Sequence, residues 1–479
     1  MAEDRATGAE GAAGAAGAAG AASATGAAGA AGAAGAAGAA GGRYLSGFGN
    51  EHATEALPGA LPAGQNSPQR CPYGLYAEQL SGSAFTAPRH QNLRSWLYRL
   101  RPSARHMGAL DESGEAPGWV SAPPREGAGL PLGAHRWGPT PLPAAGERVD
   151  FVRGVRTMSV AGDAASQVGL GAMVYVASAS MEGEALMNAD AEMMLLPQLG
   201  ALRLRTELGA LEVGVGELAV VPRGVIFAVD LLEGPSRGYV CENYGQPFTL
   251  PELGTIGANG PAAPRDFLYP TASFEDSAAP CGLWARWGGR LFHTTLDRSP
   301  FDVVAWHGNY APYKYDLRRF APMGSISVDH PDPSIFTVLT SPSQTPGVAN
   351  ADFVVFADRW LVAERTFRPP WYHRNLMSEF MGLLYGRYDA KEEGFVPGGA
   401  SLHTSFMPHG PDASGFEKAS EGALAPVRLS GTMAFMWETR LPQHPTRFAA
   451  AHPGRQQGYA GCWAPLKVRF NGTLEGDWS

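Results

Sequence analysis

Cysteine is scarce in this chain. Only four cysteines occur among 479 residues, far apart and without a CxxC pair, which supports neither a disulfide framework nor a thiolate zinc site. No apolar stretch reaches about 18 residues without glycine, proline or charge, so a membrane-spanning helix is not expected. The first residues include acids at Glu3 and Asp4, where a secretory signal would be basic and then apolar. We therefore expect a cytoplasmic protein with no membrane partner.

An excess of basic charge is also missing. The chain has 37 Lys and Arg against 45 Asp and Glu, a formal net charge of -8, and the acids are spread along the sequence. This balance argues against a nucleic-acid partner and favours an ordinary soluble protein. The length excludes a small stapled fold and is sufficient for two or three domains.

Residues 1–42 lack the aromatic and branched apolar residues that build a core. They hold 22 Ala and 12 Gly, largely as Gly-Ala-Ala repeats, with no aromatic, Leu, Ile, Val or Pro. A glycine at every third position weakens an alanine helix by roughly 1 kcal/mol each, and the segment cannot bury a core. We expect a disordered tail without chemistry.

Long amphipathic helical patterns are scarce in the rest of the chain, which contains all 39 prolines. Short alternating runs recur instead, such as ALRLRTE from Ala201 and LEVGVGELAVV from Leu211. Alternation with period two is typical of half-buried strands. The body is therefore predicted to be mainly β, a sandwich or a jelly roll.

The run GELAVVPRGVIF, from Gly216 to Phe227, has the spacing G-x5-P-x-G-x2-H of the second cupin motif, except that Phe227 replaces the histidine. A strand that ends in a Pro-Gly turn explains the run equally well. In both interpretations a metal ligand is missing here, and this half of the chain is expected to be scaffold.

Four of the 12 histidines fall within 80 residues, in PPWYHRNLMSEFMG from Pro369, in GFVPGGASLHTSFMPHGPD from Gly394, and at His330. His373 and Glu379 are six residues apart, so both would point to one face of an unbulged strand. On a helix they would lie roughly 120° apart. His403 and His409 have the same separation, but Pro408 interrupts a continuous strand there.

Two histidines and one glutamate match the facial triad that binds non-haem Fe(II) and leaves positions open for substrate and dioxygen. Four protein ligands would instead indicate a closed, zinc-like site, and histidines that only form hydrogen bonds are the plain alternative. Other templates fit poorly: GFGNEH from Gly47 lacks the third glycine of a dinucleotide fingerprint, and neither GxSxG nor GxxxxGK[ST] occurs.

Several separate blocks of the chain resemble the homogentisate 1,2-dioxygenase family, from about Tyr44 to Trp463. They are YLSGFGNEHATEALPGALPAGQNSPQRCPYGLYAEQLSGSAFTAPR from Tyr44, WHGNYAPYKYDL from Trp306, VDHPDPSIFTVLTSPS from Val328, FRPPWYHRNLMSEFMG from Phe367 and PHGPDASGFEKAS from Pro408.

This resemblance implies an architecture and an activity. It implies a β-sandwich or degenerate cupin-like N-terminal domain without metal (43–318), a C-terminal cupin-like jelly-roll domain that binds iron (319–479), few short helices, and a homohexamer of two trimers. The implied reaction opens the aromatic ring of homogentisate with O2 to give maleylacetoacetate, in the breakdown of tyrosine and phenylalanine.

The resemblance also implies roles for individual residues. The Fe(II) ligands fall on His373, Glu379 and His409, and the general base falls on His330. His403 is expected to orient the site rather than to bind iron. Contacts with the substrate are expected from Tyr388, His409, Lys391, Arg374 and Asn375.

Alternatives stay open for the activity and for single residues. Another cupin-type dioxygenase, acting on a different dihydroxylated aromatic, would use the same triad, and a non-catalytic β-sandwich binding protein would use none. Tyr388 could be a core aromatic. His307, in WHGNY, is expected to be structural because a Gly-Asn turn follows it.

Overall fold

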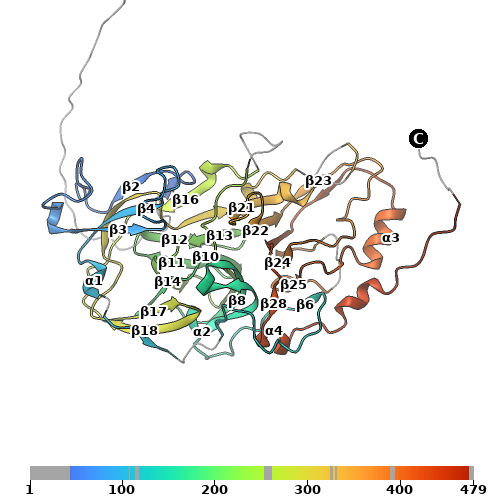
Figure 1. Ribbon diagram of the computed structural model, residues 1–479, viewed down its shortest axis with the longest axis horizontal. Coiled ribbons are helices and arrows are strands. Elements are labelled where there is room, and N and C mark those ends of the chain that lie inside the picture. The colour runs from blue at the N-terminus through green and yellow to red at the C-terminus, as the bar shows by residue number, and fades with distance from the viewer. Residues whose placement is uncertain are drawn as a thin grey trace, which may run out of the picture. The chain divides into compact units, whose positions relative to one another are not determined.

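The computed structural model describes residues 44–106, 108–113, 118–252, 261–323, 327–329, 332–388 and 394–473. The predicted tail, the predicted base His330 and the predicted substrate contact Lys391 lie outside these ranges. The described residues belong to one compact unit, Gly42–Ser479 (Figure 1).

The described chain is built from β-sheets, so the mainly-β prediction is confirmed. The largest sheet has nine strands in the order β1 (Tyr44–Ser46), β16 (Phe267–Pro270), β20 (Tyr313–Asp316), β13 (Glu217–Val221), β10 (Glu192–Leu199), β15 (Ser236–Asn243), β8 (Val168–Ala177), β7 (Val155–Asp163) and β28 (His444–Pro445).

A second sheet has seven strands in the order β12 (Gly209–Val213), β11 (Leu202–Thr206), β14 (Ile226–Leu231), β9 (Glu184–Asn188), β17 (Cys281–Trp287), β18 (Arg290–Leu296) and β5 (Asp111–Glu112). Two smaller sheets contain β2 (His52–Glu55), β19 (Val303–Gly308), β4 (Arg94–Arg99) and β3 (Tyr76–Ser81), and β23 (Arg359–Leu361) with β26 (Val427–Leu429). Strands β9 and β17 run parallel, and the other pairings of described strands are antiparallel.

The sheet that positions the candidate site has six strands in the order β21 (Thr337–Pro342), β22 (Ala349–Phe356), β27 (Met433–Thr439), β24 (Ser378–Tyr385), β25 (Ala400–His403) and β6 (His135–Trp137). Its last strand comes from the first half of the chain. Conversely, strand β28 comes from the second half of the chain and pairs with β7 in the nine-stranded sheet. The two halves are therefore connected through shared sheets.

Helices are few and short in the described residues, as predicted: α1 (Ser103–His106), α2 (Phe151–Gly154), α3 (Ala413–Glu421) and α4 (Arg447–Ala451). The longest, α3, starts where Asp412 accepts a hydrogen bond from the backbone N–H of Gly415 at 2.7 Å, an ordinary N-cap. In the described part of the chain, no helix is long and apolar enough to cross a membrane.

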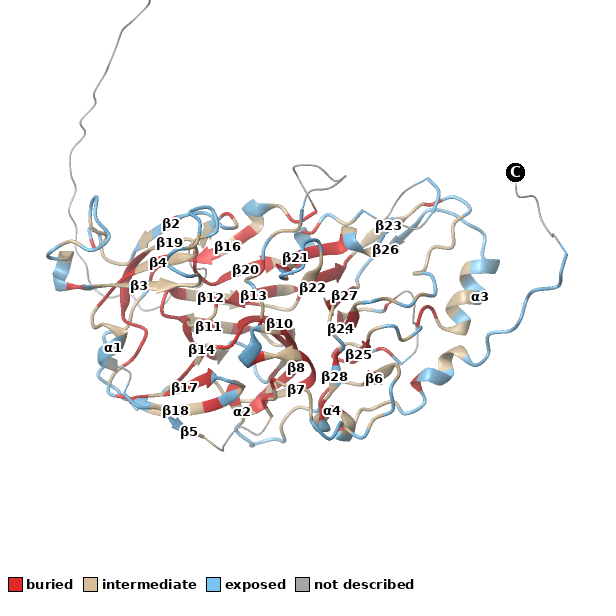
Figure 2. Cartoon of the chain, in the orientation of Figure 1, coloured by how far each residue is buried: buried red, intermediate tan, exposed pale blue. Residues whose placement is uncertain are grey.

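The core follows the sequence patterns. Strand β11, with the sequence LRLRT, alternates between buried and half-buried residues as its period-two pattern predicts. Phe227, which replaces the cupin histidine, is fully buried and packs against Phe151, with ring centroids 6.4 Å apart. Figure 2 shows the buried residues gathered in the strands of the sheets. Position 227 is therefore part of the apolar core.

Candidate metal centre

Among the three residues of the candidate site, His373, Glu379 and His409, only Glu379 lies in a named β-strand. It is the second residue of β24, which pairs with β27 on one side and β25 on the other. The opposite residues in register are Glu438 and His403. Both neighbouring strands are hydrogen-bonded to β24, so the backbone of Glu379 is held in place by the sheet. The side chain of Glu379 is buried.

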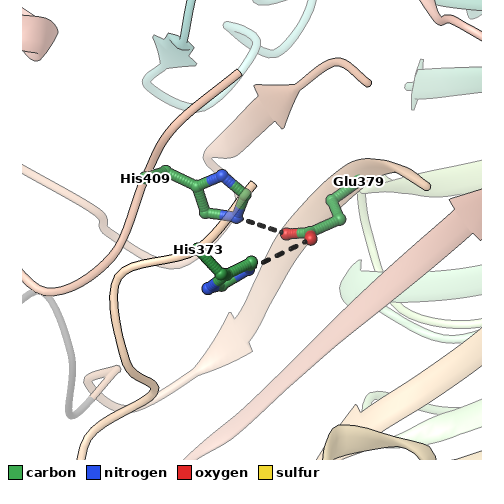
Figure 3. A group of neighbouring side chains, drawn as sticks. All are labelled: His373, Glu379 and His409. Atoms are coloured by element: carbon green, nitrogen blue, oxygen red, sulfur yellow. Dashed lines mark hydrogen bonds and ion pairs between the residues drawn. The ribbon is translucent and has the colours of Figure 1, made fainter. Parts of the chain in front are cut away.

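His373 and His409 come from two loops that one short bridge joins. The backbone N–H of His373 donates to the carbonyl of His409 at 3.0 Å, and the reverse bond is 3.1 Å. The predicted placement of His373 and Glu379 on one strand is wrong, because β24 begins only at Ser378. Figure 3 shows that the two loop histidines face the carboxylate of Glu379, which the strand carries.

Each loop also orients the ring of its histidine. Nδ1 of His373 lies 2.7 Å from the Trp371 carbonyl, and Nδ1 of His409 lies 2.9 Å from the Met407 carbonyl. A carbonyl only accepts hydrogen bonds, so in each neutral ring Nδ1 carries the hydrogen and Nε2 keeps its lone pair. This is the tautomer that a metal-binding histidine requires at Nε2.

The three side chains converge on a small volume. Nε2 of His409 lies 2.9 Å from Oε2 of Glu379, and Nε2 of His373 lies 3.5 Å from Oε1. One ligand atom from each residue lies within 4.8 Å of the others. Lone pairs on two nitrogens and a carboxylate repel one another unless a cation lies among them, so this donor set fits a divalent metal.

The electrostatics of Glu379 agree with such a site. Burial raises the pKa of its carboxyl group, but the close approach of His373 and His409 outweighs burial and lowers the pKa below its usual range. The carboxyl group is therefore an anion near neutral pH, in surroundings that require positive charge.

The trio opens onto a pocket of about 430 Å³. Buried apolar side chains form much of its wall, among them Phe336, Phe356, Met381 and Met436. A pocket of this size with a partly apolar wall leaves room for a small aromatic molecule.

Besides His409, three predicted substrate contacts line this pocket. The Tyr388 side chain is buried and also packs in the core, with its ring centroid 5.7 Å from that of Phe356. The Arg374 side chain is exposed. The amide of Asn375 lies 3.5 Å from Oε1 of Glu379, and its oxygen accepts a hydrogen bond from the N–H of Met377.

His403 lies beside the converging trio. Its ring stacks on that of His409, with centroids 4.1 Å apart and an interplanar angle of 5°. Its Nδ1 is 4.0 Å from Oε2 of Glu379, which is longer than a hydrogen bond. This position is compatible with the predicted orienting role. Of the chain around His330, the described Asp329 and Asp332 line the pocket.

Two residues of this region escaped the sequence interpretation. Glu438 of β27 lies between Glu379 and Asp352 in register and lines the pocket. Burial, then the charge of Glu379, raises its pKa well above the usual range. The hydroxyl oxygen of Tyr459 lies 2.9 Å from Nε2 of His403. For Glu438 the signal was one acid at the end of the apolar run MAFMW, and for Tyr459 the sequence offered none.

Comparison with known proteins identifies the family to which both halves of the chain are similar. The family description "Homogentisate 1,2-dioxygenase N-terminal" matches residues 43–317, and "Homogentisate 1,2-dioxygenase C-terminal" matches residues 318–470. Among solved structures, Bacillus subtilis oxalate decarboxylase is 13% identical with a TM-score of 0.29, covering 72% of this chain and 90% of the other. A cupin 2 barrel protein from Leptotrichia buccalis has 6% identity and a TM-score of 0.25, covering 60% and 88%. Such low scores carry no weight.

Proteins named homogentisate 1,2-dioxygenase are similar to this chain over nearly its whole length. The one from Rhodopseudomonas palustris BisB18 is 60% identical over 90% of this chain and 95% of its own. Those from Sinorhizobium fredii and Bradyrhizobium diazoefficiens are 59% and 61% identical, over 91% and 89% of this chain and 96% and 95% of their own. With both halves matched at this identity, the chain belongs to the homogentisate 1,2-dioxygenase family.

Proposed function

We propose that this protein is an Fe(II)-dependent dioxygenase that opens the aromatic ring of homogentisate with O2 to give maleylacetoacetate. The observation that carries the proposal is the convergence of two Nε2 lone pairs and one buried carboxylate within 4.8 Å, on the wall of a pocket of about 430 Å³. Membership of the family supports the substrate. A homohexamer, a cytoplasmic location and a boundary between the two domains at residues 318 and 319 belong to the same proposal.

In this proposal His373, Glu379 and His409 would hold the metal, as the ligands do in other sites with two histidines and one carboxylate. Iron(II) bound there supplies electron transfer between an electron-rich ring and dioxygen. The loop carbonyls of Trp371 and Met407 keep the two histidine rings in the ligand tautomer. The protein thereby fixes the ligand geometry before the substrate enters.

In the same proposal, individual side chains place the substrate and move a proton. His330 takes the proton of the ring hydroxyl as the substrate binds, since a neutral histidine is a suitable base near pH 7. Arg374 and Lys391 provide positive charge for the substrate carboxylate. Tyr388 and Asn375, which line the pocket, provide further contacts with the substrate.

The test is O2 uptake by anaerobically purified, Fe(II)-loaded protein that is offered homogentisate, with iron measured on the same sample. We expect one O2 per homogentisate and about one iron per chain. A matched control is His452→Gln, which replaces a buried histidine that contacts Thr140 at 3.0 Å and is not among the residues lining the pocket. This variant should keep both iron and O2 uptake.

Other results separate the alternatives. Iron bound without O2 uptake would contradict homogentisate as the substrate, and a panel of other dihydroxylated aromatics would then find the right one. Absence of iron from the wild-type protein would contradict the dioxygenase and favour a non-catalytic binding protein.

A further inference from the structure

The pocket beside the candidate metal centre carries more acidic than basic side chains. Five acidic residues and three arginines occur among the described residues that line it. Three of the acids, Glu379, Glu438 and Asp352, lie in register on adjacent strands of the six-stranded sheet. An anionic ligand is repelled by such surroundings unless a cation is held at a defined place in the pocket.

Arg368 is a pocket cation that the fold holds in place. Its side chain is half-buried, whereas that of Arg374 is exposed. The guanidinium group of Arg368 donates from Nε and Nη2 to the carbonyl of Ala363, at 3.3 and 2.9 Å, and from Nη1 to the carbonyl of Ala425. Ala363 lies two residues after β23 and Ala425 two residues before β26, the strand paired with it. Because these contacts already order the side chain, a ligand does not have to order it.

The same contacts leave part of the guanidinium group unused. An arginine has five N–H donors, and Arg368 gives three of them to carbonyls, so one N–H remains on each of Nη1 and Nη2. In the part of the chain that the structure describes, Arg368 forms no ion pair with a carboxylate. One N–H on each terminal nitrogen suits the two oxygens of a carboxylate, which would also balance the charge.

We propose that Arg368 binds the carboxylate of an arylacetate substrate and thereby selects homogentisate over neutral diphenols. The proposal rests on the proposed function, which supplies the substrate. Arg368 precedes His373 by five residues, and Pro369 and Pro370, whose φ angles are fixed, stiffen the connection. The anion-binding group and a proposed metal ligand therefore lie on one stiff segment, which suits a substrate that carries both a ring hydroxyl and a carboxylate.

The experiment measures anaerobic binding of two ligands to the Fe(II)-loaded protein by calorimetry. The ligands are homogentisate and methylhydroquinone, which has the same ring hydroxyls but no carboxylate. In Arg368→Gln we expect homogentisate affinity to fall by about 10- to 100-fold and methylhydroquinone affinity by less than about threefold, because charge-assisted hydrogen bonds are lost only for the anion. Arg368→Lys should restore part of the difference, since it keeps the charge but not the planar fork.

A matched control is Arg428→Gln, which removes an exposed arginine of β26 whose guanidinium carbon lies 5.9 Å from the centroid of the Trp360 ring. Arg428 is not among the residues lining the pocket, so this variant should bind both ligands as the wild type does. Arg374→Gln is measured as well, because the proposed function gives Arg374 a similar task. If Arg368 is the main carboxylate-binding residue, Arg374→Gln should cause the smaller loss of homogentisate affinity.

Equal losses of affinity for the two ligands in Arg368→Gln would show that Arg368 only holds the two strands together, and would overturn the proposal. A larger loss in Arg374→Gln would also overturn it. If Arg368→Gln does not fold, Arg368→Lys gives the same comparison of the two ligands. A wild-type protein that binds homogentisate through Arg368 but consumes no O2 would contradict the proposed function and leave the carboxylate site standing. A wild-type protein that binds neither ligand would contradict both.

Discussion

At the scale of single residues, two histidines are oriented by the same local device. His373 and His409 each donate from Nδ1 to the carbonyl two residues earlier in their own loop. His403 makes a different contact, because its Nε2 lies 2.9 Å from the hydroxyl oxygen of Tyr459. This difference separates the expected ligands from the expected orienting residue, because only the first two present Nε2 to Glu379.

Substitution of single histidines tests that distinction. We expect His409→Ala to lose a ligand, so that iron per chain falls from about one toward zero. We expect His403→Ala to retain iron with about 10- to 100-fold weaker affinity or activity. Metal analysis after dialysis at matched free Fe(II) measures both. Iron retained in His409→Ala and lost in His403→Ala would show that the two roles are exchanged.

The base role predicts a different pattern for His330. Replacement by alanine should lower turnover by about 10² to 10⁴, the usual contribution of general acid–base catalysis, and leave iron in place. Steady-state O2 uptake and iron content on one preparation measure this. Complete loss of iron from His330→Ala would contradict the base role and would indicate that His330 acts on the metal.

At the scale of elements, the candidate site is formed by one strand and two loops. Alternating sequence patterns predict strands but not how loops place their side chains. The alternation of β11 and the mainly-β class followed from period-two patterns, since buried and exposed faces impose that period. The shared strand for His373 and Glu379 was wrong, because β24 begins only at Ser378 and the N–H of Met377 donates to the side-chain oxygen of Asn375 in a local turn. Tyr459 was missed because it lies 56 residues beyond His403 and reaches it only through tertiary packing.

The bridge between the two ligand loops needs a glycine beside His409. A Cβ at Gly410 would lie 2.5 Å from Cδ1 of Tyr372 and 3.0 Å from its Cα. The half-exposed ring of Tyr372 can move away, but its backbone cannot move without separating the loops. The Gly410→Ala substitution should therefore weaken metal binding, by roughly 10-fold, more than it lowers the thermal midpoint.

A suitable control for this substitution is Gly133→Ala, where an added Cβ meets no atom within 4 Å. Metal titration and circular dichroism melts of both variants measure the two effects. Wild-type metal affinity in Gly410→Ala would show that the close approach of the two loops is not needed for the site.

At the scale of the whole molecule, the half without the predicted metal ligands takes part in the site. Strand β6 contributes the edge of the six-stranded sheet, and its Arg136 contacts Tyr459. Buried polar contacts also cross between the halves: the Asn350 amide donates to the carbonyl of Gly169 at 3.1 Å and to the side-chain oxygen of Asn243 at 3.0 Å. A substitution that destabilises the first half is therefore expected to disturb the structure of the candidate site as well.

One buried carboxyl group in the first half makes that stability depend on pH. Glu192 begins β10, and its carboxylate accepts a hydrogen bond from the backbone N–H of Phe248 at 2.8 Å. Burial raises the pKa of Glu192 from 4.5 to about 7, although this hydrogen bond opposes the rise. Between these two pH values the folded protein binds a proton that the unfolded chain has released, so stability falls as pH rises through this range.

The Glu192→Gln substitution isolates this effect, since an amide has a similar shape, still accepts the hydrogen bond from Phe248 and does not titrate. Urea unfolding of both proteins at pH 5, 6, 7 and 8 should show the wild type losing about 2 to 3 kcal/mol of unfolding free energy relative to Glu192→Gln, nearly all of it below pH 7.5. Every other titrating group is common to the two proteins, so the difference reports Glu192 alone. A constant difference across this range would mean that Glu192 ionises in the folded protein at its ordinary pKa, and that its charge is compensated within the nine-stranded sheet.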